Sequence, residues 1–121
     1  SRVGITEIWD GTSWTHVSGT LALGRIESAL SGTTTEAVIA GGNTGDPAPP
    51  TTPTATAETW DGTSWASVAA MSDAQNDGGS SSSGGSTTAI VFGGAPAGTI
   101  SASEEWTVPA TTYAIKTFTA S

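Results

Sequence analysis

The chain lacks cysteine and has few cations, which excludes several classes of site at the outset. Without cysteine it forms neither disulfides nor thiolate metal sites, and its single histidine, His16, cannot complete a zinc site. Lysine and arginine total 3 against 11 acidic residues, which gives a formal net charge of −8. Because nucleic acids and anionic membranes are negatively charged, we expect neither as a partner.

Long hydrophobic runs and large aliphatic side chains are also scarce. No stretch approaches the ~20 apolar residues of a membrane span. The first residues contain no signal-peptide core, so we interpret the N-terminus as a cut or processed end. Val, Ile, Leu and Phe together make up 18 of 121 residues, a low share that is typical of disorder. Five tryptophans favour a folded chain, because periodically placed indoles can fill small cores between sheets.

Small and β-branched polar residues are abundant. Serine and threonine account for 38 of the 121 residues, and there are 16 glycines. Threonine favours strands, and glycine with serine favours turns, so the composition predicts an all-β fold. The length is that of one domain.

A seven-residue segment, Ile8–Trp14, returns 51 residues later as Thr59–Trp65 with six of seven positions identical. Its Asp-Gly pair, between two tryptophans, predicts a tight hairpin that brings the two indoles together. A degraded third copy follows around Trp106. The repeated positions are Trp9, Asp10, Gly11 and Trp14, then Trp60, Asp61, Gly62 and Trp65, and finally Trp106.

Two further landmarks recur with the tryptophans. An apolar segment closes in Gly41-Gly42 and again in Gly93-Gly94, 52 residues apart. The glutamates Glu7, Glu58 and Glu104 each precede a repeated tryptophan by two positions. A period of about 50 residues is typical of propellers and related arrays, and each repeat has room for four strands.

The tract 78–85, made only of glycine and serine, has two interpretations. Its composition is that of a flexible linker. However, the distance from the hairpin to the Gly-Gly pair is nearly equal in the two repeats, so the tract occupies the place of residues 26–34. We therefore favour a strand of small residues over a linker.

These motifs resemble the kelch repeat: an apolar strand ending in Gly-Gly, a variable loop, Glu-x-Trp-Asp, a second Trp, and then Val with Leu or Met. Arg25 stands where that family often carries an arginine, and Gln75 or Asn76 stands there in the next repeat. The resemblance implies propeller blades of four antiparallel strands, divided as a half blade over 1–20, a blade over 25–71 and a final blade over 76–119. Since a closed ring needs about four to eight blades, these two and a half would form an incomplete ring, closed by further chain or by oligomerisation.

The sequence is also similar to kelch-like C-terminal regions of marine bacteriophage tail and virion proteins. The similarity lies in the residues of the repeats, in the final Glu-Glu-Trp-Thr-Val-Pro and in the threonine-rich end. This similarity implies a non-enzymatic structural or adhesion module, located on a virion or extracellular. Expected partners are copies of itself, other virion or appendage proteins and cell-surface glycans. The alternative is a secreted, oligomeric, lectin-like propeller. The candidate binding loop, chosen because its length differs between repeats, contains Asp46, Pro47, Pro49, Pro50 and Thr54.

The remaining polar residues favour structural roles over catalysis or metal binding. Asp10 and Asp61 lack the alternating oxygen ligands of a calcium loop and are explained by the turn. Adjacent Glu104 and Glu105 on one strand face opposite ways, so they form no catalytic pair. His16 is expected on a surface strand. We therefore predict no enzyme activity, cofactor or metal.

Overall fold

The computed structural model describes residues 3–45, 52–82, 84–95 and 103–108, and these form three antiparallel sheets with no helix among them. The all-β prediction is confirmed. No described helix is long and apolar enough to cross a membrane. The strands are β1 (Thr6–Trp9) and β2 (Trp14–Val17); β3 (Ala29–Gly32), β4 (Ala37–Ala40), β5 (Ala57–Trp60) and β6 (Trp65–Val68); and β7 (Gly79–Ser80), β8 (Thr88–Phe92) and β9 (Ser103–Thr107).

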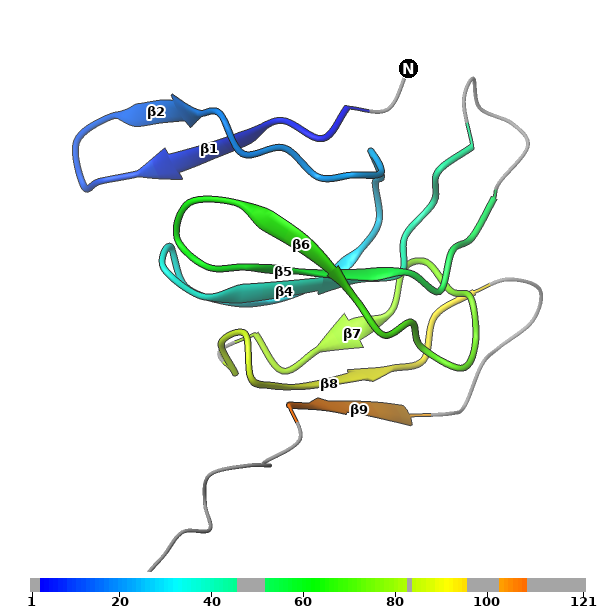
Figure 1. Cartoon of the computed structure of the whole chain (residues 1–121). Coiled ribbons are helices and arrows are strands. Elements are labelled where there is room, and N and C mark those ends of the chain that lie inside the picture. Colours follow the sequence, from blue (N-terminus) through cyan, green and yellow to red (C-terminus); the bar gives the residue numbers. More distant parts are fainter. Residues whose placement is uncertain (1–2, 46–51, 83, 96–102, 109–121) are drawn as a thin grey trace, which may run out of the picture.

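Each strand pairs with the next along the chain, so each sheet is an antiparallel meander. The first sheet has the order β1-β2, the middle sheet β3-β4-β5-β6 and the third sheet β7-β8-β9. The three sheets lie one above another in chain order (Figure 1). The middle sheet therefore has a neighbour on each face, whereas the first and third sheets are the ends of the described stack.

Both copies of the Asp-Gly hairpin have the same turn. In the first, the Oδ1 atom of Asp10 accepts the backbone N–H groups of Thr12 and Ser13, both at 2.8 Å. In the second, Asp61 accepts the equivalent two N–H groups at the same distances. The glycine after each aspartate has φ +98°, which a residue with a Cβ adopts only with strain. The indole centroids lie 5.6 Å apart in the first hairpin and 5.4 Å apart in the second, so the predicted approach of the tryptophans is confirmed.

The Gly-Gly pairs turn the chain at the end of β4 and again after β8. Gly41 and Gly42 have φ +69° and +106°, and Gly93 and Gly94 have φ +70° and +100°. A Cβ at Gly42 would lie 2.2 Å from the Ser28 hydroxyl. After each pair, the chain forms an isolated antiparallel bridge, Ile26↔Asn43 in one repeat and Asn76↔Ala95 in the next. Backbone conformation therefore favours glycine at all four positions, and close approach adds to this at Gly41, Gly42 and Gly94.

The glycine-serine tract contributes a strand at Gly79–Ser80, which pairs with β8 and lies against β3. The Ser80 hydroxyl donates to the Leu30 carbonyl at 2.8 Å, and the Ser81 and Ser31 hydroxyls are 3.1 Å apart. The strand interpretation therefore holds for Gly79–Ser80, and the other described residues of the tract lie outside the strand. Likewise β3 begins at Ala29 instead of residue 26, since Glu27 has φ +60° and breaks the extended chain.

The core between the middle and third sheets is built of small side chains. Alanines on β3, β4 and β5 pack with Val91 of β8, and Val68 and Met71 lie beside them. Among the described tryptophans only Trp60 is fully buried, at 3% exposure. Indoles therefore fill less of this interior than the sequence led us to expect, because small side chains form most of the cluster. This explains how a chain with few large aliphatic residues can still build a core.

Candidate functional site

An ion pair is enclosed between the middle sheet and the connection that follows β2. The Nη2 atom of Arg25 lies 2.9 Å from Oε2 of Glu58, a residue of β5, and both side chains are almost fully buried. Nη1 of Arg25 also donates to the carbonyls of Gly41 and Thr56, at 3.0 and 2.8 Å. The other carboxylate oxygen of Glu58 accepts the backbone N–H of Ala22 at 2.8 Å. The pair thus ties the connection after β2 to β4 and β5.

Burial and charge act on Arg25 in opposite directions. Burial lowers the pKa of the Arg25 guanidinium from its ordinary value, and the charge and hydrogen bond of Glu58 raise it in part. A buried pair of this kind adds little net stability over an apolar replacement, but removal of one partner leaves the other charge buried alone. Arg25 and Glu58 are therefore interdependent, and their chemistry fixes how the first and middle sheets meet.

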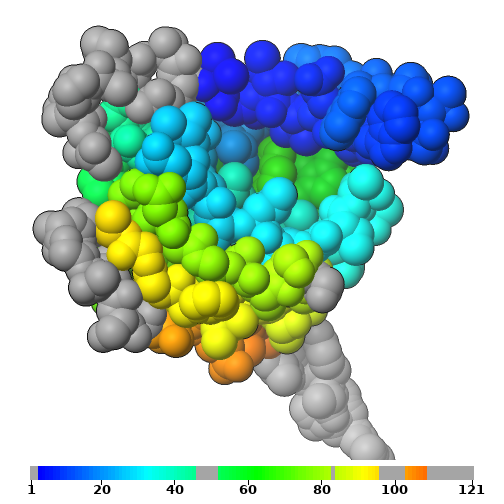
Figure 2. Space-filling model, turned by 180° about the vertical axis from the view of Figure 1, so that it is seen from behind, coloured from blue at the N-terminus to red at the C-terminus, as the bar shows by residue number. Residues whose placement is uncertain are grey.

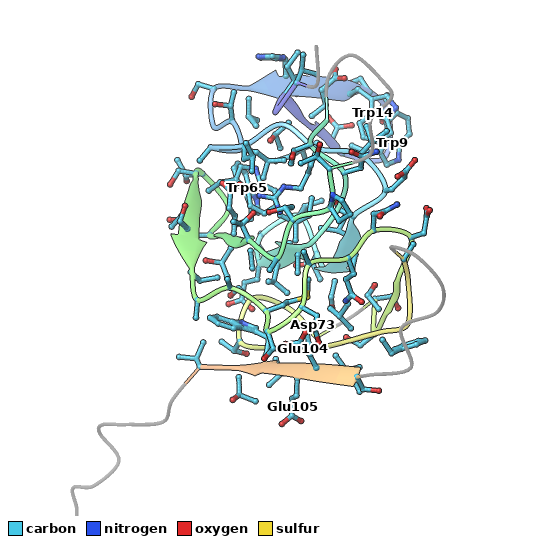
Figure 3. All side chains as sticks on the ribbon, turned by 90° about the vertical axis from the view of Figure 1, so that its right-hand side faces the viewer. Trp9, Trp14, Trp65, Asp73, Glu104 and Glu105 are labelled. Atoms are coloured by element: carbon cyan, nitrogen blue, oxygen red, sulfur yellow. The ribbon has the colours of Figure 1, made fainter. Side chains whose placement is uncertain are left out.

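Glu104 of β9 has the same role one repeat later. Its carboxylate accepts the backbone N–H groups of Ser72 and Asp73, at 2.5 and 3.1 Å, and so binds the connection after β6. Figure 3 shows Glu104 directed toward Asp73 and Glu105 on the opposite side of the strand, which confirms that the two glutamates face opposite ways. Gln75 is buried at the position of Arg25 in this repeat, and its carbonyl accepts the N–H of Gly42 at 2.7 Å.

The tryptophans of β5 and β9 also repeat one contact. The indole N–H of Trp60 donates to the Thr34 carbonyl at 2.9 Å, and that of Trp106 donates to the Ser86 carbonyl at 3.1 Å. Each acceptor lies in the loop of the first hairpin of the same sheet, between β3 and β4 for Thr34 and between β7 and β8 for Ser86. The indole N–H of Trp65 instead reaches the first sheet, where it donates to the Thr6 hydroxyl at 2.8 Å. These indoles hold hairpins and sheets together.

Trp9 and Trp14 lie in a different environment, although their hairpin has the same sequence. They are 45% and 65% exposed, and neither indole N–H has an acceptor among the described residues. Both line a hollow of about 340 Å³ between the first and middle sheets, together with Leu30, Trp60 and Trp65. Figure 3 shows the two labelled indoles side by side at the first sheet.

A second hollow, also about 340 Å³, lies between the middle and third sheets and is lined largely by alanines, with Met71, Glu104 and Trp106. No group of three or more His, Cys, Asp or Glu side chains that could hold a metal is present in the described ranges. Of the acidic residues that line this hollow, Glu104 binds the backbone N–H groups of Ser72 and Asp73.

The candidate binding loop is described only in part. Asp46, Pro47, Pro49 and Pro50 lie outside the described residues. Thr54 is described, and its backbone donates to the Gly42 carbonyl at 2.9 Å and accepts from Gln75 at 3.2 Å. Thr54 is therefore held in the bridges that link the repeats. His16 is exposed on β2, opposite Glu7 of β1.

No family model matches the chain, and no curated protein matches it. The kelch resemblance thus continues to depend on the repeated residues themselves.

Proposed function

We propose that the chain is a non-enzymatic structural module whose sheets are kelch-like propeller blades, stacked as part of an incomplete ring. One observation carries the proposal: Glu58 and Glu104 each accept backbone N–H groups from the connection that follows the preceding sheet. Each also lies two residues before a tryptophan whose indole binds the loop of the first hairpin in its own sheet. Recurring contacts of this kind are what repeat proteins use to fix one unit on the next.

Several of the recurring acidic residues are occupied by scaffold contacts, whereas Glu7 is exposed. The aspartates Asp10 and Asp61 bind the N–H groups of their turns, and Glu58 is bound by Arg25 and Ala22. A catalytic acid or base needs a proton-transfer position that faces substrate, and these groups face the backbone. Their arrangement supports architecture in preference to catalysis.

The two ends of the stack support a role in an assembly. At the first sheet Trp9 and Trp14 are exposed, and at the third sheet Ile90 and Phe92 of β8 are 40% and 47% exposed. Patches of exposed large apolar side chains on soluble proteins commonly mark interaction sites. Together with the resemblance to virion proteins and the strongly acidic charge, they favour a surface module of a virion or extracellular appendage, joined to copies of itself or to other appendage proteins.

Sedimentation velocity of the purified chain over a range of concentrations tests this proposal. We expect species larger than the 11.9 kDa monomer, and Ile90→Glu on the end face of the third sheet should weaken the association. Ala66→Glu, at an exposed position on β6 of the middle sheet, adds the same charge away from this end face, and as the control it should associate like the parent. A stable, folded monomer at all concentrations would contradict the proposal.

A lectin-like propeller is the second candidate, and the open Trp9–Trp14 pair favours it. Two indoles 5.6 Å apart beside a hollow could stack on sugar rings. A glycan array with the parent and Trp14→Ala distinguishes the candidates. Binding that Trp14→Ala abolishes without a change in melting temperature would support the lectin, whereas an absence of glycan binding would support the structural module.

A further inference from the structure

Two acidic residues at equivalent positions of the middle and third sheets lie side by side. Glu27 precedes β3 and Asp77 precedes β7, and both have left-handed backbone conformations, with φ +60° and +61°. The backbone N–H of Asp77 donates to the Glu27 carbonyl at 3.0 Å, which holds the two residues next to each other. Figure 2 shows the segments around them in contact at the surface, in light blue and yellow-green.

Both carboxylates converge on the side-chain amide of Asn76. The Nδ2 atom of Asn76 donates to Oε2 of Glu27 at 2.9 Å and to Oδ2 of Asp77 at 3.1 Å. Asn76 is only 5% exposed, whereas Glu27 and Asp77 are exposed to solvent. The amide is therefore the buried end of a small acidic site that solvent can reach.

The second polar atom of this amide has no use in the structure as it stands. Oδ1 of Asn76 is buried and has no hydrogen-bond partner among the described residues. A buried acceptor without a partner is costly, and such an atom is rare in a folded protein. Rotation of the amide by half a turn about its Cβ–Cγ bond would place Oδ1 where Nδ2 now lies, and it would break no hydrogen bond of Oδ1.

The rotated amide would present a third oxygen to the two carboxylates. Oδ1 would then lie about 3 Å from one oxygen of Glu27 and one of Asp77, a separation typical of oxygens that share one Ca²⁺ at bond lengths of about 2.4 Å. Three such oxygens repel one another unless a cation lies between them. The arrangement therefore has room for a cation in place of the two present hydrogen bonds.

The charges of the chain favour an incoming cation. Arg25 is the one lysine or arginine among the described residues, and its guanidinium is bound to Glu58. Glu27 and Asp77 thus have no cationic side chain beside them in the described part of the chain. The formal net charge of −8 adds a field that attracts cations from solution.

We propose that Glu27, Asp77 and Asn76 bind a calcium ion that joins the start of β3 to the start of β7. The two carboxylates and Oδ1 of Asn76 supply the protein ligands, and water completes the shell. Such hard oxygen ligands suit Ca²⁺, whose coordination is flexible, whereas Mg²⁺ requires a near-ideal octahedron and gives up water reluctantly. With three protein ligands we expect a dissociation constant of about 10⁻³ M, as in weak extracellular sites.

This inference goes beyond the proposed scaffold role and does not depend on it, since it requires only the contact between the middle and third sheets. It also departs from the sequence-based expectation of no metal site. Glu27 and Asp77 approach each other only in the fold, and the site does not use the turn aspartates Asp10 and Asp61.

NMR titration of the full chain with CaCl₂ up to about 10 mM tests the inference, with NaCl at equal ionic strength as the control for screening. We expect saturable shifts of the Glu27 and Asp77 amides and of the Asn76 side-chain NH₂, which loses its two acceptors. MgCl₂ should bind more weakly. Glu27→Gln should weaken calcium binding by about tenfold or more, whereas Glu105→Gln removes the same charge at an exposed position on β9 and should bind like the parent.

Asp77→Asn is the second variant, because asparagine tolerates the positive φ of this position and keeps the backbone in place. It should also lose saturable binding, and Asp73→Asn, at an exposed position on the same connection, is its matched control. This variant decides the inference even if Glu27→Gln fails to fold.

Three results would overturn the inference. CaCl₂ could cause no larger shifts than NaCl of the same ionic strength. Saturable shifts could centre on residues other than Asn76 and its two carboxylates. Folded Asp77→Asn could bind calcium as tightly as the parent. By contrast, a monomer in sedimentation or binding to glycans would contradict the proposed function, while saturable calcium binding at Asn76 would still support this inference.

Discussion

The two copies of the Trp-Asp-Gly-Thr-Ser-Trp hairpin share their turn, their strand register and their indole spacing, but not their burial. Trp60 is 3% exposed and Trp9 is 45% exposed, although both end a strand before the same turn. The hairpin is set by local chemistry, since aspartate and glycine satisfy its backbone in both copies. Burial is set by the neighbouring sheet, which the middle hairpin has and the first lacks on the corresponding face.

The largest difference between the two hairpins is expected when the tryptophan that ends their first strand, Trp9 or Trp60, is replaced. Truncation of a buried aromatic costs about 3–5 kcal/mol, a large share of the ~5–15 kcal/mol that stabilises a domain. We therefore expect Trp60→Ala to unfold in much less urea than the parent, and Trp9→Ala to cost clearly less. Equal losses for the two variants in urea unfolding would show that the first hairpin is as enclosed as the second.

The next largest difference in stability is expected for the contacts of the equivalent glutamates Glu58 and Glu7. Arg25→Ala leaves Glu58 buried without its cation, and breaking a buried pair in this way costs about 3–5 kcal/mol. Glu7→Gln alters an exposed side chain and should change the unfolding free energy by about 0.5 kcal/mol or less. Thermal unfolding of both variants beside the parent measures the difference. A Glu7→Gln variant as unstable as Arg25→Ala would contradict the account.

Alanine substitutions at Gly11 and Gly42 distinguish the cost of backbone strain from the cost of a steric clash. Gly11 has φ +98° with nothing within 4 Å of an added Cβ, so Gly11→Ala should cost only the conformational strain, about 1–2 kcal/mol. Gly42 has φ +106°, and an added Cβ would lie 2.2 Å from the Ser28 hydroxyl and 2.8 Å from the Ile26 carbonyl. Gly42→Ala should therefore be the less stable variant by differential scanning calorimetry. The reverse order would show that the Gly-Gly turn is loosely packed.

Substitution of the turn aspartates Asp10 and Asp61 should change stability least, and by the same amount in both copies. Backbone N–H groups, of Ser13 and Thr12 in one turn and of Ser64 and Thr63 in the other, lower the pKa of Asp10 and Asp61 from the ordinary value of 3.8. Because the folded-state pKa is depressed, the stabilisation is present above the unfolded pKa and lost as the pH falls through the folded pKa. Asp10→Asn and Asp61→Asn should each be slightly less stable than the parent at pH 7.

These differences from the parent should shrink in acid below pH 3.8, where the parent carboxylates take up protons. Urea unfolding at a series of pH values checks this. A deficit of either variant that persists unchanged through the acid range would show that the charge of the aspartate does not hold the turn.

Local features of this fold could be predicted from the sequence, and contacts between sheets could not. The Asp-Gly turns, the Gly-Gly turns and the small-residue strand β7 all follow from backbone chemistry and repeat spacing. The Arg25–Glu58 pair was missed, because its members are 33 residues apart and each has a plausible exposed position when considered alone. The signal was present, however: three glutamates recur in register in an acidic chain with only 3 cations, one of which stands in the repeat.

The unequal burial of the tryptophans could not be predicted from the sequence, for a related reason. Periodicity identifies Trp9 and Trp60 as equivalent, and equivalence suggests equal surroundings. A unit at the end of a stack lacks a neighbour on one face, so the same residue has a different environment there. The arrangement of the sheets decides which copy of the tryptophan lies at the end of the stack and is exposed.

Hydrogen exchange of the five indole N–H groups in the parent chain tests the central claim most directly, because each tryptophan reports on its own contact. The account predicts slow exchange for Trp60, Trp65 and Trp106, whose indoles donate to Thr34, Thr6 and Ser86, and fast exchange for Trp9 and Trp14. Protection of Trp9 and Trp14 equal to that of Trp60 and Trp65 in the monomeric chain would contradict it.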